Sequence, residues 1–248
     1  MNQTAMHRAI FTFLLTLLLP LTAVAADPVL KIATSQYPPF EYTANGRVTG
    51  SDAELVRRVV RQMGYQPEIE LLPWIRAEAR VMAGDADLIF SLTRSEKRDR
   101  YYYFTAPLNT VQDVLYKHRN RDLQWQDYDD LAGLRIGLSA SYSYAPDFMA
   151  WLEEGKALSV TAVSHEHPEL SSLKMLAFGR IDVFICERSV CDYLIRTHGD
   201  QFPELLQLEA MPGSVGPQRT FHAAISRQHP EGRALRDQFD RALAQLRE

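Results

Sequence analysis

The fold is decided by a helix-to-strand step that occurs twice along the chain. Its first copy reads Met82-Ala83-Gly84-Asp85-Ala86-Asp87-Leu88-Ile89-Phe90, and its second reads Ala177-Phe178-Gly179-Arg180-Ile181-Asp182-Val183-Phe184-Ile185. In each copy a glycine ends a helix, an aspartate follows three residues later, and an apolar run then forms a buried strand. This step is typical of β-α-β units, in which helices cover parallel strands. Two copies therefore predict two related α/β lobes.

Apolar periodicity extends both units outward from these steps. In the first unit we expect strands over 29–34, 69–72 and 86–91 and helices over 52–63 and 74–83. In the second we expect strands over 111–117, 134–138, 159–163, 181–185 and 220–225 and helices over 144–152, 170–178, 189–197 and 231–246. Ligands of such sheets bind outside the carboxyl ends of the strands, which places a site between the lobes.

The first 26 residues differ from the rest of the chain. His7 and Arg8 form a weakly basic start, residues 9–19 are apolar, and Ala23-Val24-Ala25-Ala26 supplies small residues for cleavage. This is the layout of a secretory signal peptide, and the apolar run is shorter than the roughly 20 residues that span a membrane. We expect residues 1–26 to be removed on export to the periplasm.

Composition limits the function classes. The formal net charge of −4 gives no broad cationic field, so nucleic acid is not expected as a partner. The only two cysteines, Cys186 and Cys191, form either a disulfide or two small buried apolar positions, and the sequence leaves both open. His165-Glu166-His167 is more typical of solvated histidines than of metal ligands. We expect no metal and no cofactor.

Short motifs follow one another in a fixed order along the chain. They are Tyr37-Pro38-Pro39-Phe40, Gly50-Ser51-Asp52, Pro73-Trp74, Gly84-Asp85-Ala86-Asp87, Ser91-Leu92-Thr93-Arg94-Ser95-Glu96-Lys97-Arg98, Phe104-Thr105-Ala106-Pro107, Leu134-Arg135-Ile136-Gly137 and Gly179-Arg180-Ile181-Asp182. This ordered set, which covers nearly all of residues 28–246, resembles the family 3 extracellular solute-binding proteins. Those are the periplasmic polar amino-acid-binding components of ABC transporters.

The resemblance implies a fold and a mode of action. The implied fold is the α/β type II periplasmic-binding-protein-like fold, with two lobes of mixed sheets flanked by helices and joined by two hinge strands. Lobe 1 would comprise residues 27–112 plus 219–248, and lobe 2 residues 113–218. The lobes would close around a small solute and deliver it, as a monomer, to an inner-membrane ABC permease.

The resemblance also implies ligand contacts from lobe 1. Arg98 matches the family arginine that clamps the ligand α-carboxylate, for which a guanidinium fork is well suited. Ser91 and Thr93 match contact positions at the end of a buried strand. Tyr37 and Trp74 match the two positions whose aromatic faces sandwich the ligand side chain.

From lobe 2, the resemblance implies a second carboxylate-contacting loop and an acid. The loop is Ser141, Tyr142 and Ser143, whose backbone N–H groups would favour an anion. Glu187 matches the acid that receives the ligand ammonium. Arg76, in the first turn of a helix, either meets an anionic ligand group or lies at the surface.

Several positions depart from the family pattern. Thr34 is neutral where the family has an acid, Ser51 replaces an aromatic residue, Ser141 stands in place of a glycine, and the chain ends at Glu248 without a tryptophan-bearing tail. An amino acid is therefore the favoured solute, with another small carboxylate or amine left open.

Two other functions are open. One is an exported enzyme on the same fold, similar to cyclohexadienyl or arogenate dehydratases, with Glu187 or Glu41 as the acid. The other is a soluble partner that presents a ligand to a receptor. Because we find no independent catalytic motif, we expect a binding protein and no catalytic residues.

Overall fold

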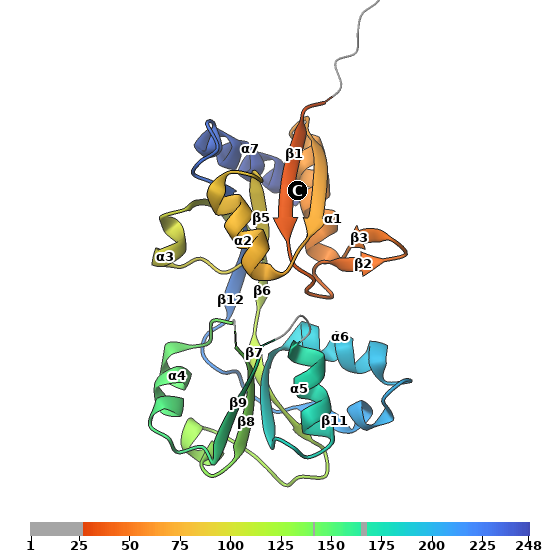
Figure 1. The fold of residues 1–248 in the computed structure, drawn as a ribbon, viewed down its shortest axis with the longest axis vertical. Helices are drawn as coiled ribbons and strands as arrows, with labels where there is room; N and C mark the ends of the chain where they lie inside the picture. The colour runs from red at the N-terminus through yellow and green to blue at the C-terminus, as the bar shows by residue number, and fades with distance from the viewer. Residues whose placement is uncertain (1–26, 141, 165–167) are drawn as a thin grey trace, which may run out of the picture.

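The computed structural model describes residues 27–140, 142–164 and 168–248 (Figure 1). The predicted signal peptide, Ser141 and His165-Glu166-His167 lie outside the described residues. The described chain forms two lobes, one above the other in Figure 1, and each lobe is built on a five-stranded sheet. Within these residues no helix is long and apolar enough to cross a membrane.

Lobe 1 is built on the sheet with strand order β4-β1-β5-β12-β6. Its strands are β1 (Val29–Thr34), β4 (Gln66–Leu71), β5 (Leu88–Leu92), β6 (Tyr102–Val111) and β12 (Arg219–Ser226). Its helices are α1 (Ser51–Gln62), α2 (Trp74–Ala83), the short α3 (Glu96–Asp99) and α7 (Gly232–Gln245). Strands β4, β1 and β5 run parallel, whereas β12 is antiparallel to both β5 and β6.

The periodicity of the sequence accounts for the helices of lobe 1. Val56, Val59 and Val60 share one face of α1 and are fully buried in a core that they form with the apolar residues of β1, β5 and α7. Gly64 follows this helix with a φ of 83°, a left-handed conformation that glycine adopts without steric cost. The hairpin of β2 (Tyr42–Ala44) and β3 (Arg47–Thr49) turns at Asn45-Gly46, a pair typical of two-residue hairpin turns.

Lobe 2 is built on the sheet with strand order β11-β7-β10-β8-β9. Its strands are β7 (Asp113–His118), β8 (Arg135–Ser139), β9 (Ser159–Val163), β10 (Val183–Glu187) and β11 (Leu208–Ala210). Its helices are α4 (Pro146–Glu153), α5 (Pro168–Ala177) and α6 (Arg188–His198), with 3-10 turns η1 (Tyr128–Leu131) and η2 (Pro203–Gln207). Strands β9, β8 and β10 are parallel, and β7 is antiparallel to β10.

Two connecting segments join the lobes. Gln112 links β6 of the first sheet directly to β7 of the second, and the chain returns from β11 to β12 (Figure 1). An ion pair joins the two connections, because Arg219 Nη2 on β12 lies 2.6 Å from Asp113 Oδ1 on β7. The two sheets are thus connected through two neighbouring backbone segments.

The structure differs from the sequence-based prediction at β6. We predicted a strand over 111–117, and the structure divides this region into the end of β6 and the start of β7. Residues 102–110 of β6 escaped prediction because Pro107 interrupts them. Proline is tolerated there because β6 is the edge strand of its sheet and its register with β12 shifts at this point.

Candidate ligand-binding site

The residues implicated by the sequence follow the carboxyl ends of parallel strands. Tyr37 follows β1, Thr93 follows β5, Tyr142 follows β8, and Glu187 is the last residue of β10. The ring centroids of Tyr37 and Tyr142 are 5.8 Å apart. This contact between the lobes brings the two strand edges face to face.

Arg98 lies in a fixed setting on lobe 1. Its Nε donates to Glu78 Oε1 at 3.0 Å, and its Nη1 donates to the carbonyl and hydroxyl oxygens of Thr93 at 3.0 and 3.2 Å. The guanidinium carbon lies 5.6 Å from the centre of the Trp74 ring. The structure therefore gathers Arg98, Thr93 and Trp74, and it adds Glu78, one turn after Trp74 on α2.

Ser91 points away from this group. Its Oγ lies 2.6 Å from Glu41 Oε2 and 2.9 Å from Asp52 Oδ2, and all three residues are buried. Its φ of 59° is in the left-handed region, which only a few per cent of non-glycine residues adopt. Asn109 Nδ2 lies 2.7 Å from each Asp52 oxygen. We call Glu41, Asp52, Ser91 and Asn109 the buried acid cluster.

The hydrogen bonds of the buried acid cluster indicate which of its two carboxyl groups carries a proton. A serine hydroxyl donates one hydrogen bond, so its contacts with two carboxyl groups require that one of them carries a proton. Asp52 also accepts from Asn109, which favours its ionised form. Burial, followed by the charge of Asp52, raises the pKa of Glu41 well above its ordinary value, although the Ser91 bond opposes this. Burial also raises the pKa of Asp52, and the hydrogen bonds from Ser91 and Asn109 oppose that shift. We therefore expect Glu41 to be the neutral partner.

This assignment predicts a pH dependence of stability. A carboxyl group whose folded-state pKa is raised contributes stability that is fully present below its unfolded pKa, about 4.5, and is lost as pH rises through the folded pKa. Glutamine mimics the neutral acid. Glu41→Gln should therefore gain stability relative to wild type as pH rises, by about 1.4 kcal/mol for each unit of pKa shift.

Urea unfolding of both chains at about pH 4, 6 and 8 measures this difference. Glu68→Gln, at an exposed position on β4, is the matched control and should not show the trend. A Glu41→Gln difference that stays constant from acid to neutral pH would contradict a neutral Glu41.

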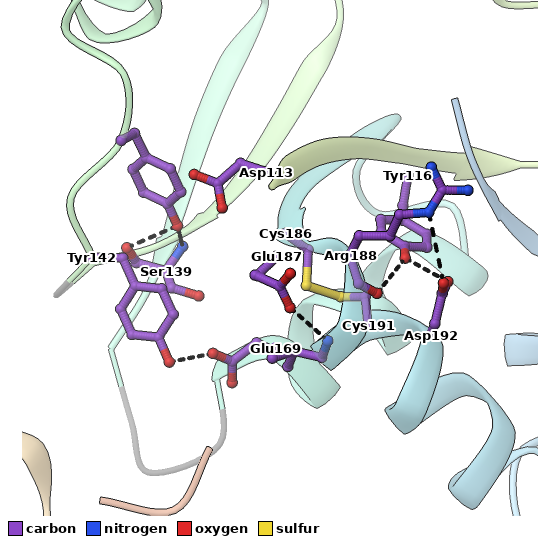
Figure 2. Close-up of a disulfide and its surroundings, with 12 residues drawn as sticks. Asp113, Tyr116, Ser139, Tyr142, Glu169, Cys186, Glu187, Arg188, Cys191 and Asp192 are labelled. Carbon is purple, nitrogen blue, oxygen red and sulfur yellow. Dashed lines mark hydrogen bonds and ion pairs between the residues drawn. A yellow bond between two sulfur atoms is a disulfide. The ribbon is translucent and has the colours of Figure 1, made fainter. Parts of the chain in front are cut away.

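In lobe 2, Tyr142 connects the interlobe contact to an acid. Its hydroxyl donates to Glu169 Oε1 at the start of α5 (Figure 2). On the other side, the Tyr37 ring packs against Phe40 and Phe221, with centroids 5.9 and 6.1 Å apart. An aromatic contact thus spans the lobes beside their connecting segments.

Ser143 and Arg76 are predicted site residues that do not take part in the aromatic contact between the lobes. The backbone carbonyl of Ser143 lies 3.4 Å from Arg219 Nη1, on the connecting strand β12. Arg76 is exposed in the first turn of α2. Ser141, the remaining member of the predicted loop, lies outside the described residues.

Glu187 lies where β10 meets α6, and it is 4% exposed. Its Oε2 accepts from the Val190 N–H at 2.9 Å and caps the helix, while Oε1 accepts from the Gln112 N–H at 3.5 Å. Burial raises the pKa of Glu187, and the backbone N–H groups act in the opposite direction. The carboxylate therefore contacts both the helix N-terminus and a connecting segment.

The two cysteines are joined by a disulfide, which decides between the alternatives left open by the sequence. The Cα atoms of Cys186 and Cys191 are 6.2 Å apart, and the bond encloses the turn that carries Glu187 (Figure 2). Over the described part of the chain, no cluster of three or more His, Cys, Asp or Glu side chains is arranged to hold a metal ion.

The sequence pattern of the bacterial extracellular solute-binding proteins, family 3, matches residues 30–248. The probable amino-acid-binding protein YxeM of Bacillus subtilis is 28% identical over 224 residues, which cover 89% of this chain and 80% of the relative. The arginine-binding extracellular protein ArtP of the same species is 22% identical over 217 residues, covering 86% and 78%.

Solved structures share the fold. A histidine kinase sensor domain with similarity to periplasmic binding proteins has a TM-score of 0.72 at 22% identity, covering 90% of this chain and 91% of that chain. An ancestral arginine-binding protein bound to arginine has a TM-score of 0.72 at 16% identity, covering 90% and 93%. These neighbours confirm the predicted two-lobed α/β fold.

Proposed function

The chain belongs to the bacterial extracellular solute-binding proteins, family 3, and on that premise we propose that it captures an α-amino acid between its two lobes. The observation that carries this proposal is the placement of charge. Lobe 1 supplies the Arg98 guanidinium after β5, and lobe 2 supplies the Glu187 carboxylate at the end of β10. Opposite charges on facing edges suit a zwitterion, whose carboxylate and ammonium carry the complementary signs.

Each proposed contact has a chemical role. Arg98 and the Thr93 hydroxyl bind the α-carboxylate, and Glu187 receives the ammonium. Tyr37 and Trp74 enclose the side chain of the solute. The loop of Ser141, Tyr142 and Ser143 covers the carboxylate from lobe 2.

Ser91 has a supporting role in this scheme. Its hydroxyl lies between Glu41 and Asp52 and is engaged within lobe 1. Since Ser91 lies two residues before Thr93, the buried acid cluster anchors the loop that leads to Arg98. We propose this role in place of the direct hydroxyl contact expected from the sequence.

Family membership supports a cellular setting for this function. We propose that residues 1–26 are cleaved on export to the periplasm, and that a monomer delivers the solute to an ABC permease in the inner membrane. The two moving bodies are residues 27–112 plus 219–248 and residues 113–218. A probable amino-acid ABC transporter-binding protein of Haemophilus influenzae, 28% identical over 160 residues, supports the transport role.

We also propose that the protein is not an enzyme. The relatives named above are binding proteins, which supports this view. A dehydratase of the kind considered from the sequence would convert prephenate to phenylpyruvate. Formation of phenylpyruvate by the purified chain would contradict the proposal.

A thermal-shift screen tests the proposed function. A ligand at one hundred times its dissociation constant stabilises the native state by about 2.7 kcal/mol, which corresponds to a rise in Tm of roughly 5–10 °C for a chain of this size. We expect such a rise with at least one of the twenty L-amino acids, and none with the amide of the same compound, which lacks the α-carboxylate. A chain stabilised by no amino acid at millimolar concentration would overturn the proposal.

A further inference from the structure

The disulfide encloses the turn that carries the proposed ammonium receptor. Cys186 is the residue before Glu187 on β10, and Cys191 lies in the first turn of α6. Both cysteines are buried, at 4% and 0% exposure, among the apolar residues of lobe 2. The bond thus ties the end of the strand to the start of the helix beside the Glu187 carboxylate (Figure 2).

The position of the Glu187 carboxylate depends on this turn. Its Oε2 accepts from the N–H of Val190, which lies inside the ring closed by the disulfide. The Arg188 N–H, from the same turn, donates to the Gln112 carbonyl at 3.0 Å. Movement of the first turn of α6 relative to β10 would therefore shift the carboxylate, and binding groups act well only within about half an ångström of their productive position.

A second brace holds the same turn from the other side. The Tyr116 hydroxyl lies 3.1 Å from the Arg188 carbonyl and 2.6 Å from Asp192 Oδ1. Neither hydrogen bond of this brace involves Glu187 or a cysteine. It therefore offers a control in which the turn and α6 lose two hydrogen bonds while the covalent ring of the disulfide stays closed.

We propose that the Cys186–Cys191 disulfide is a positioning element of the solute site, which holds the Glu187 carboxylate where it receives the ammonium group of the solute. The inference rests on the proposed function, since it requires that Glu187 meet an ammonium. It makes affinity for the amino group depend on a covalent bond that forms in an oxidising compartment. Neither cysteine contacts the solute in this arrangement.

The test separates positioning from general stability. Calorimetry gives the affinities of the tightest-binding L-amino acid and of its analogue without the α-amino group. Both are measured on wild type, on Cys186→Ala/Cys191→Ala, on Tyr116→Phe, on Glu187→Gln, and on the cysteine variant carrying Glu187→Gln. Urea unfolding confirms that each variant is folded at the assay temperature.

We expect the cysteine variant to lose about 10-fold in affinity for the amino acid, the lower end of the effect of removing a supporting contact, and less than about 2-fold for the analogue. Tyr116→Phe should affect neither ligand. In the Glu187→Gln background, removal of the disulfide should cause no further loss.

Three results would overturn the inference. They are an unchanged affinity of the cysteine variant, equal losses for the amino acid and its analogue, and a loss that persists in the Glu187→Gln background. The last two would show that the disulfide only stabilises lobe 2. Failure of the proposed function gives a different result, because the wild-type chain would then bind none of the twenty amino acids.

Discussion

Replacement of Arg98 by alanine is expected to lower the affinity for the amino acid by about 100-fold or more. Removing one partner of a buried, hydrogen-bonded charge pair costs about 2–5 kcal/mol, and 2.7 kcal/mol is a factor of about 100. Arg98 is prepared for this pairing, because Glu78 and Thr93 already hold its guanidinium in place. Little conformational freedom is therefore lost when the carboxylate arrives.

Two further variants make the measurement specific. Arg98→Lys keeps the charge and loses the planar fork, so its affinity should fall between those of wild type and alanine. Arg94→Ala removes a neighbouring exposed arginine that pairs with Asp99, and calorimetry should show no change in affinity. An Arg98→Ala variant that is folded and binds as tightly as wild type would remove Arg98 from the site.

Local patterns explain how much of the fold the sequence predicts. Strands β1 and β9 match their predicted bounds, and α2 begins and ends where Trp74 and Gly84 predicted. Each of these elements shows a periodic pattern of apolar residues and an end signal within a few residues, so a single sequence is enough to recognise it. Strand β6 lacks both, since its position depends on pairing with β12, more than a hundred residues later in the chain.

The candidate site is less predictable because its side chains pair over long distances. Ser91 meets Glu41 and Asp52 across 50 and 39 residues, and no local pattern records that contact. Its hydroxyl was therefore expected at the ligand, and the structure turns it into lobe 1. Motif order singled out Arg98 and Glu187, but it did not indicate Glu78 or Glu169, whose roles appear only when α2 and α5 are in place.

The ion pair between Arg219 and Asp113, on the connecting strands, also could not be predicted from the sequence. Its loss should have the largest effect on stability. Arg219→Leu should destabilise the chain by about 3 kcal/mol at neutral pH, since it leaves a buried charge without its partner. Asp113 is 4% exposed, and burial already raises its pKa while Arg219 opposes the shift. Removal of Arg219 should therefore raise that pKa further.

The effect of Arg219→Leu should vary with pH in a known direction. Because the folded-state pKa of Asp113 is raised, the contribution of Asp113 to the free energy of unfolding is complete below the unfolded pKa of about 3.8 and is lost as pH rises. The pKa is raised further in Arg219→Leu, so this variant should lose more stability than wild type over the same rise in pH. The gap between wild type and Arg219→Leu should thus be smaller at about pH 4 than at pH 7. Urea unfolding at both values measures it.

A double variant identifies the buried charge as the cause. Asp113→Asn/Arg219→Leu removes both charges, so it should recover part of the lost stability at neutral pH and depend less on pH than the single variant. Equal destabilisation of the single and double variants at every pH would instead assign the loss to the packing of Arg219. Asp113 directly follows Gln112, whose N–H contacts Glu187, so the affinity of these variants for the solute is measured as well. A double variant that regains stability without regaining affinity would show that the tether between the lobes and the solute site depend on different interactions.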